Sequence, residues 1–112
     1  MEKLSNQKCI PCEVGGEPLN ADEIAQFLSQ LEGKWVVKDN HSLERQFKFK
    51  NFVETMKFVN KVADLAESEG HHPDLHIFYN KLTIELWTHA VGGLSVNDFI
   101  VATKINNIWQ LS

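Results

Sequence analysis

The 112-residue chain is long enough for one domain with a single modest hydrophobic core. Its 43% hydrophobic and 23% charged residues are ordinary for a soluble globular protein, and no stretch approaches the roughly 20 apolar residues that span a bilayer. The net charge of −4 and the scattered basic residues argue against nucleic acid as a partner. Residues 1–7 lack the apolar segment of a secretory signal, so we expect a cytoplasmic protein.

Residues 1–19 contain two prolines and two glycines, and we expect an irregular N-terminal arm there, followed by one domain over residues 20–112. Cys9 and Cys12 have a Cys-x-x-Cys spacing. Two thiols cannot complete a four-ligand zinc site, and a thioredoxin-like motif should open a helix after a strand. We therefore expect both thiols to be reduced and without a role, with a disulfide or a weak metal contact as the alternative.

The first predicted element is a helix that begins after Asn20 and stops at Gly33. Asn20 and Glu23 have the form of a capping box, in which the Asn side chain accepts from a backbone N–H and the acid lies at the positive end of the helix. The apolar residues that follow have the i, i+3, i+4, i+7 spacing of one helix face: Ile24, Phe27, Leu28 and Leu31.

Next comes a segment with the two-residue period of β-strands. Trp35–Lys38 is predicted as a short strand, with Asp39 and Asn40 as the turn. A longer partner strand follows, in which Leu43, Phe47 and Phe49 lie on one apolar face and alternate with polar residues. These residues form the first predicted hairpin.

A second helix, capped at Asn51, is predicted to end near Gly70, and a second hairpin follows it. The hairpin strands are residues 77–79 and 82–88, across a turn at residues 80–81. The two faces of the latter strand carry different side chains: Leu82, Ile84 and Leu86 on one, and Thr83, Glu85, Trp87 and then His89 on the other.

Ser95 and Asp98 repeat the capping pattern before a third helix, whose apolar stripe runs from Phe99 to Trp109. The order is therefore α-β-β-α-β-β-α. Strands grouped in hairpins favour a four-stranded antiparallel sheet with helices on one face, the α+β class. Such a sheet leaves two edge strands, which pairing across a dimer would cover.

His71-His72-Pro73 is the most unusual polar segment, directly after the second helix. A residue before proline is pushed to an extended conformation, and neighbouring side chains then point in different directions. His89 ends the fourth strand, and Asp98 lies in the first turn of the last helix, where a helix cap alone would explain it. His41 is most simply a surface residue, and His76 opens a strand.

This group of histidines suits proton transfer. Imidazole gives and takes protons near neutral pH, and the chain contains no nucleophile motif or Gly-rich phosphate loop. Two positioned acid–base groups suit the elimination of water. Three histidines and an aspartate could instead bind zinc, and a polar surface loop at His71-His72 is a further alternative.

The spacing of these residues resembles the signature of the pterin-4a-carbinolamine dehydratase family. In this chain, Glu67, His71-His72-Pro73, Tyr79, His89 and Asp98 are separated by three, five, nine and eight residues. The resemblance extends from about Leu19 to Ile108. Many members carry an acidic residue directly after the second site histidine, where this chain has Ala90.

The resemblance implies an α+β fold, dimers whose sheets join edge to edge or tetramers, and no metal or organic cofactor. The implied reaction is loss of water from 4a-hydroxytetrahydropterin to give quinonoid dihydropterin. Pterin-dependent aromatic amino-acid hydroxylases, notably phenylalanine hydroxylase, generate that substrate. Some bacterial members are connected instead with molybdenum enzymes, and some relatives are non-enzymatic dimerisation or assembly factors.

Site roles follow from the resemblance by position. His71 and His89 resemble the acid–base histidines, and His72 would hold and polarise the pterin and share the proton work. Asp98 would orient a histidine. The resemblance further implies a substrate pocket lined by Glu67, Pro73, Thr88 and Trp35, with Trp35 as an aromatic wall for the flat ring; core packing is the alternative for Trp35.

Overall fold

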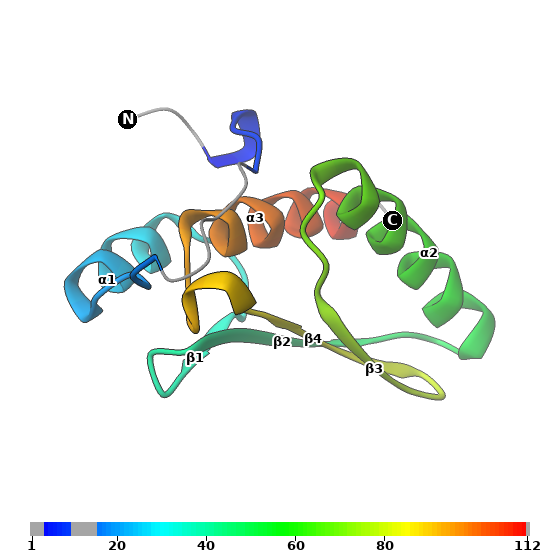
Figure 1. Ribbon diagram of the computed structural model, residues 1–112. Helices are drawn as coiled ribbons and strands as arrows, with labels where there is room; N and C mark the ends of the chain where they lie inside the picture. The colour runs from blue at the N-terminus through cyan, green and yellow to red at the C-terminus, as the bar shows by residue number, and fades with distance from the viewer. Residues whose placement is uncertain (1–3, 10–15, 112) are drawn as a thin grey trace.

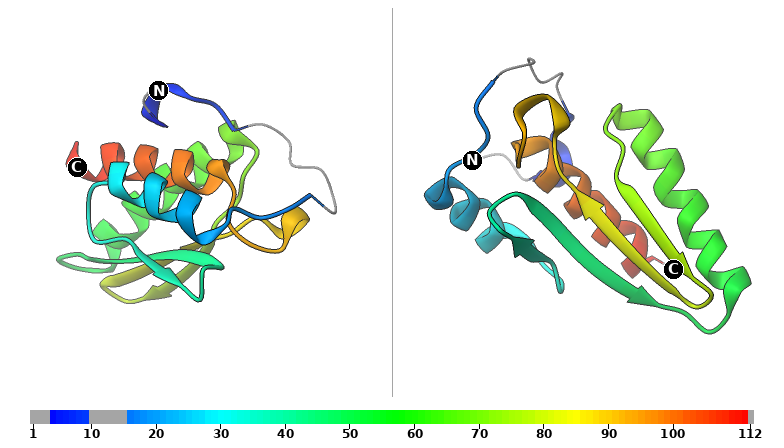
Figure 2. Two further views of the ribbon diagram at one scale, coloured as in Figure 1. Left: turned by 90° about the vertical axis from the view of Figure 1, so that its left-hand side faces the viewer. Right: turned by 60° about the horizontal axis from the view of Figure 1, so that its bottom comes forward.

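The computed structural model describes residues 4–9 and 16–111 (Figure 1). Within these residues, an antiparallel sheet of four strands in the order β1-β2-β4-β3 carries three α-helices on one face (Figures 1 and 2). The helices are α1 (Ala21–Gln30), α2 (Phe52–Glu69) and α3 (Val96–Gln110), and the strands are β1 (Val36–Lys38), β2 (Ser42–Lys48), β3 (Asp74–Phe78) and β4 (Lys81–Leu86). Two short 3-10 helices, η1 (Leu4–Asn6) and η2 (His89–Val91), complete the order. The predicted α+β class and element order are confirmed.

The sheet packs on the helices through one face of its two central strands. The register places Leu43 opposite Leu86 and Phe47 opposite Leu82. These four side chains are almost completely buried, as is Ile84. The alternation predicted for β4 is therefore confirmed, and it turns Trp87, just beyond the strand, to the opposite face from Leu86.

Helix α3 is the central helix of the molecule, between α1 and α2 (Figure 1). Its buried residues come from several sides of the helix and not from a single stripe: Phe99, Ile100, Val101, Ala102 and Ile105. The predicted stripe is thus confirmed only in part, because neighbours on several sides bury more of this helix than an amphipathic pattern indicates. The first turn of α3 contacts the segments that follow α2 and β4, through His71 and Thr88, and this is where the candidate site lies.

Element boundaries differ from the prediction at several places. α1 ends at Gln30, before Gly33, because Leu31 turns to an extended conformation. β3 begins at Asp74, three residues earlier than predicted. The second hairpin turns at Tyr79 and Asn80, one residue early, with Tyr79 at φ 45°. The turn at Asp39 and Asn40, both at φ 53°, and the end of α2 at Gly70, φ 65°, match the prediction.

The described part of the N-terminal arm is not simply irregular. Leu4 begins η1, is 4% exposed and belongs to the hydrophobic core. Cys9 also packs against that core. Cys12 lies outside the described residues, so the structure describes only the first cysteine of the Cys-x-x-Cys motif. In the described part of the chain, no helix is long and apolar enough to cross a membrane.

Candidate active site

The exit of α2, the end of β4 and the first turn of α3 meet at one cleft of about 640 Å³. Gly70 ends α2 in the left-handed conformation and sends the chain into His71-His72-Pro73. Besides these histidines and the proline, Trp87 and one residue each from the N-terminal arm, α2 and α3 line the cleft. The lining includes His71, His72, Pro73, Trp87, Thr88, His89, Cys9, Glu69 and Asn97.

His71 and His72 point in different directions, as expected for an extended segment before proline. The side chain of His71 is only 12% exposed and reaches Asp98, whereas that of His72 is 64% exposed. Nε2 of His72 lies 3.0 Å from Glu67 Oε1, and the Glu67 side chain is 74% exposed. A pair this exposed contributes little energy. Glu67 thus contacts His72 without lining the cleft.

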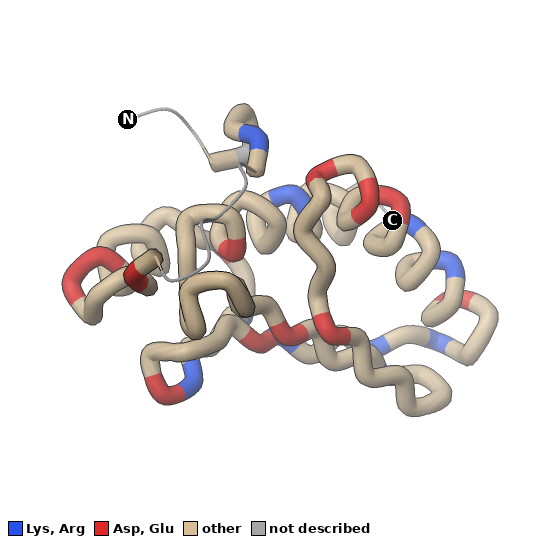
Figure 3. The backbone as a smooth tube through the Cα atoms, viewed as in Figure 1, with Lys and Arg blue, Asp and Glu red and all other residues tan. Residues whose placement is uncertain are grey.

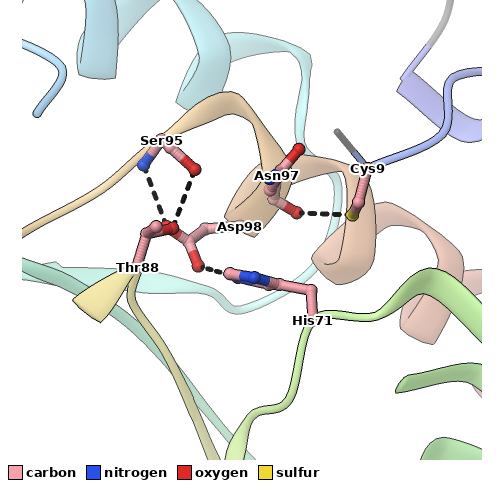
Figure 4. Close-up of polar contacts among 6 residues, drawn as sticks. All are labelled: Cys9, His71, Thr88, Ser95, Asn97 and Asp98. Atoms are coloured by element: carbon pink, nitrogen blue, oxygen red, sulfur yellow. Dashed lines mark hydrogen bonds and ion pairs between the residues drawn. The ribbon is translucent and has the colours of Figure 1, made fainter. Parts of the chain in front are cut away.

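Asp98 is completely buried and is held by three partners (Figure 4). Its Oδ1 lies 2.6 Å from His71 Nε2. Its Oδ2 accepts from the Thr88 hydroxyl and from the Ser95 backbone N–H, both at 2.9 Å. The Ser95 and Thr88 hydroxyls are 2.8 Å apart. Because the Thr88 hydroxyl donates its hydrogen to Asp98, the Ser95 hydroxyl donates to the Thr88 oxygen. One oxygen of Asp98 therefore caps α3, and the other contacts the ring of His71.

The contact with Asp98 decides which nitrogen of neutral His71 carries the proton. A carboxylate accepts, so Nε2 carries the hydrogen and Nδ1 keeps its lone pair. Nδ1 is then the nitrogen that can take a proton. The buried carboxylate stabilises the imidazolium that results, as in other histidine–carboxylate pairs.

His89 lies in the same cleft but is held differently. It begins η2 and does not end a strand as predicted. Its ring stacks on Trp87, with ring centroids 3.7 Å apart and an interplanar angle of 22°. His41, expected to be a simple surface residue, packs against the same indole at 4.5 Å. Sequence reasoning placed Trp87 and His89 on one face but did not identify Trp87 or His41 as site residues.

Trp35 does not line this cleft, which corrects the expectation of an aromatic wall. It is 7% exposed and packs edge-on against Phe47 in the core. Its indole N–H donates to Asn106 Oδ1 at 2.7 Å. Trp35 therefore packs in the core, which was the alternative given for it from the sequence. His76 is exposed in β3 and is also absent from the lining.

The N-terminal arm contributes a wall that the sequence did not predict. The Cys9 backbone N–H donates to Glu69 Oε1 at 2.9 Å, and Lys104 Nζ donates to Glu69 Oε2 at 2.7 Å. Burial, followed by the negative charge of Glu69, raises the pKa of the Cys9 thiol to about 12. The thiol is therefore neutral and unreactive at physiological pH.

Glu69 belongs to a group of acidic residues at the C-terminal end of α2 (Figure 3). Burial alone would raise the pKa of its carboxyl. The hydrogen bond from Lys104, the Cys9 N–H and the nearby ammonium charge outweigh that effect and hold the pKa below its usual value. Glu69 is therefore ionised in the fold and links the arm, α2 and α3 beside His71.

A second hollow, of about 650 Å³, lies beside β1 and the C-terminal end of α3. Four basic side chains and Trp109 line it, but no histidine does: the basic residues are Lys34, Lys38, Arg45 and Lys48. We take the histidine cleft as the candidate active site because it brings together several histidines, whose imidazoles exchange protons near neutral pH. Among the described residues, no group of three or more His, Cys, Asp or Glu side chains is arranged to hold a metal, so the zinc alternative gains no support.

A sheet covered by helices, with a buried His–Asp pair and a second histidine in one cleft, defines a small α+β protein with a histidine-lined cleft. The chain belongs to the pterin 4 alpha carbinolamine dehydratase family, whose family model matches residues 17–108. The predicted family membership is thereby confirmed.

Relatives over nearly the whole chain carry the same description. A protein of Alkaliphilus metalliredigens, provisionally described as a pterin-4-alpha-carbinolamine dehydratase, is 48% identical over 106 residues, which cover 95% of this chain and 96% of the relative. One of Rickettsia bellii, described in the same way, is 47% identical over 103 residues, covering 92% and 91%.

Two solved structures share the fold. A transcriptional coactivator/pterin dehydratase from Brucella melitensis superposes with a TM-score of 0.75 at 33% identity, covering 82% of this chain and 98% of that one. A pterin dehydratase-like protein identified as a RuBisCO assembly factor of the alpha-carboxysome superposes with a TM-score of 0.59 at 19% identity, covering 69% and 90%. The second likeness concerns the fold alone.

Proposed function

We propose that this protein removes water from 4a-hydroxytetrahydropterin by histidine acid–base catalysis, giving quinonoid dihydropterin. The observation that carries the proposal is the 2.6 Å contact between His71 and the buried carboxylate of Asp98, in a cleft that also contains His89. The cleft volume of about 640 Å³ lies in the range of small-molecule sites. Family membership supplies the class of substrate.

In the proposed reaction, His71 is the base and His89 the acid. His71 Nδ1 takes the proton of the ring N–H next to carbon 4a, and Asp98 stabilises the imidazolium. Protonated His89 gives its proton to the 4a-hydroxyl as the C–O bond breaks, and water leaves. The electrons of the N–H bond form the new C=N bond, so atoms and charges balance. His89 is exposed and recovers its proton from solvent.

The other polar residues of the cleft would hold the substrate. His72, Pro73 and Thr88 line it, and His72 also contacts Glu67. Because no step requires a redox or electrophilic group, the proposed reaction needs no cofactor. We further propose that the protein acts in the cytoplasm as a homodimer or tetramer and recycles pterin for an aromatic amino-acid hydroxylase such as phenylalanine hydroxylase.

A non-enzymatic dimerisation or assembly role is the second candidate. It is favoured by the fold shared with a protein identified as a RuBisCO assembly factor. A binding role alone, however, explains Asp98 as the cap of α3 but not its contact with His71 in a cleft that also contains His89. The His71–Asp98 pair therefore supports the enzyme.

The experiment follows the decay of freshly generated 4a-hydroxytetrahydropterin by ultraviolet absorbance, with and without purified protein. We expect a faster decay with the wild type, and a loss of about 10²-fold or more of the added rate in His71→Ala and in His89→Ala. His76→Ala is the matched control, since this histidine is exposed in β3 and does not line the cleft. A folded wild-type protein that leaves the decay unchanged would contradict the proposal.

A further inference from the structure

We propose that Trp87 is a positioning residue that fixes the His89 ring for proton transfer, with His41 packing against the same indole. The proposal rests on the dehydratase function proposed above. Trp87 and His89 have nearly parallel rings with centroids 3.7 Å apart, and His41 lies 4.5 Å from the same indole. Their ring contacts make up what we call the His41–Trp87–His89 stack.

The backbone prepares this contact. Beyond β4, Thr88 forms a bridge with Gly93, in which the Thr88 N–H donates to Gly93 O at 2.7 Å and the Gly93 N–H returns to Thr88 O at 3.3 Å. The side chain of Thr88 is fixed to Asp98. Trp87 and His89 therefore flank an anchored residue, and their side chains lie on the same side, as residues two apart in an extended segment do.

Stacking on Trp87 is the contact that holds the His89 ring in place. It makes no hydrogen bond or ion pair to any residue that the structure describes, and the residue is exposed. An unsupported ring there would sample several rotamers and hold the reactive one only part of the time. His71 needs no such support, because a hydrogen bond to Asp98 holds it.

The two kinds of support suit the two proposed tasks. A hydrogen bond to a carboxylate occupies one nitrogen of His71 and leaves the other as a base. A stacked ring is held by its face, so both nitrogens of His89 remain free to give a proton to substrate and to take one from solvent. An indole face also accepts a neutral or a protonated imidazole, so the support persists through the reaction.

Trp87 is not placed as a stacking platform for the substrate. Although it lines the cleft, its indole is already in ring contact with two histidines, His89 at 3.7 Å and His41 at 4.5 Å. His41 belongs to the β1–β2 turn, where its backbone N–H donates to Lys38 O at 2.8 Å. The stack therefore connects that turn to the cleft, and the flat substrate ring must pack elsewhere.

The test is a double-mutant cycle on the full chain with Trp87→Ala and His89→Ala. We expect Trp87→Ala to lower kcat about tenfold with a smaller change in KM, and to have less than a twofold further effect when His89 is already Ala. Trp87→Phe should restore most of kcat, whereas Trp87→Leu, which keeps apolar bulk without a ring, should behave like Ala. His41→Ala should cost about two- to threefold.

A direct probe of the contact is the NMR signal of the His89 ring protons. The ring current of the indole should shift it upfield in wild type and in Trp87→Phe, but not in Trp87→Leu. Two outcomes would overturn the positioning role alone, provided that the wild type is active. One is a Trp87→Leu variant with the kcat of the wild type. The other is a Trp87→Ala change that lowers kcat as much in the His89→Ala background as in the wild type. An inactive wild type would instead overturn the proposed function, and this role with it.

Discussion

At the scale of single residues, the site depends on how Asp98 divides its two oxygens. All three of its partners are donors: His71 Nε2, the Thr88 hydroxyl and the Ser95 N–H. A buried carboxylate can satisfy these donors together, whereas an amide of the same size must turn its NH₂ group toward one of them. The charge of Asp98, and not only its shape, is therefore required.

We expect Asp98→Asn to lower kcat about 10²-fold, because His71 loses the partner that sets its tautomer and stabilises its imidazolium. It should also lower the free energy of unfolding by about 1–3 kcal/mol, since a donor is left facing a donor in a buried position. Steady-state kinetics and urea unfolding measure the two effects. Asp64→Asn, an exposed carboxylate of α2, is the control. Wild-type kcat in Asp98→Asn would contradict this role.

The residues of the site differ in how far the sequence could predict them. His71, His72 and Asp98 were found because they form a fixed spacing with His89. The contacts of His41, Cys9 and Glu69 join segments far apart in the chain, and no local pattern marks them. Trp35 shows the opposite limit, because a tryptophan at this position suits a pocket wall or a core equally, and only packing decides.

At the scale of elements, α2 ends with acidic residues and with no basic residue in its last turn. This arrangement is unfavourable beside the negative end of the helix dipole. Lys104 of α3 compensates for it at Glu69, whose side chain is only 8% exposed. The ion pair therefore fastens α2 to α3 and, through the Cys9 N–H, holds the arm at the cleft.

We expect Glu69→Gln to lower the free energy of unfolding by about 1–3 kcal/mol at pH 7, because Lys104 loses its partly buried partner. The folded pKa of Glu69 lies below its unfolded value, so the contribution is complete above the unfolded pKa and disappears as pH falls through the folded one. Urea unfolding at pH 7 and pH 3 should thus show a smaller difference from wild type at pH 3.

The matched control for this ion pair is Glu67→Gln on the same helix. The Glu67 side chain is 74% exposed and contacts only His72, so its change should cost less than about 1 kcal/mol at pH 7. Equal losses in both variants, or a Glu69→Gln difference that does not depend on pH, would contradict the role of the ion pair.

The junction between α1 and β1 contains Gly33, with a φ of 94°. A side chain at this position would collide with the Arg45 guanidinium, whose Nη1 donates to Asn106 Oδ1 at 2.7 Å. We expect Gly33→Ala to lower the free energy of unfolding by about 2–4 kcal/mol, from the strained φ and the displaced Arg45 together. Thermal and urea unfolding measure the loss.

Gly92→Ala provides the comparison, because Gly92 also has a positive φ, 68°, but open space where a Cβ would be. It should cost about 1 kcal/mol, the backbone effect alone. If the two variants lost the same stability, the collision with Arg45 would have no energetic consequence.

The helix starts were the most predictable boundaries. The caps at Asn20, Asn51 and Ser95 are local in sequence, so the helix starts follow from them. The second hairpin turns one residue early because tertiary hydrogen bonds fix it there. The Tyr79 carbonyl accepts from Thr55 Oγ1 at 2.9 Å, which holds Tyr79 at a positive φ that a tyrosine rarely adopts.

At the scale of the whole molecule, exposed apolar side chains gather where the β3–β4 turn meets the start of α2. We call Phe52, Val53, Phe78 and Tyr79 the tip patch; each is between 47% and 64% exposed. The hydrogen bond from Thr55 to the Tyr79 carbonyl keeps the two segments together. The patch borders β3, an edge strand of the sheet. An unpaired edge beside apolar surface is where a second copy would bury most.

We therefore expect a homodimer that pairs through the β3 edge and covers the tip patch. Sedimentation should give twice the 12.8 kDa mass of one chain for the wild type. Phe78→Lys should weaken dimerisation by about 30-fold or more, because a buried aromatic side chain contributes about 2 kcal/mol or more at an interface. Val36→Lys is the matched control on the opposite edge strand, where Val36 is 56% exposed.

Dimerisation and dehydratase activity should be separable by mutation. No residue of the His71–Asp98 pair or of the His41–Trp87–His89 stack is part of the tip patch. Monomeric Phe78→Lys should therefore keep most of the dehydratase rate. If Val36→Lys dissociates and Phe78→Lys does not, the pairing edge is β1. A Phe78→Lys monomer with no activity would mean that the second chain completes the site.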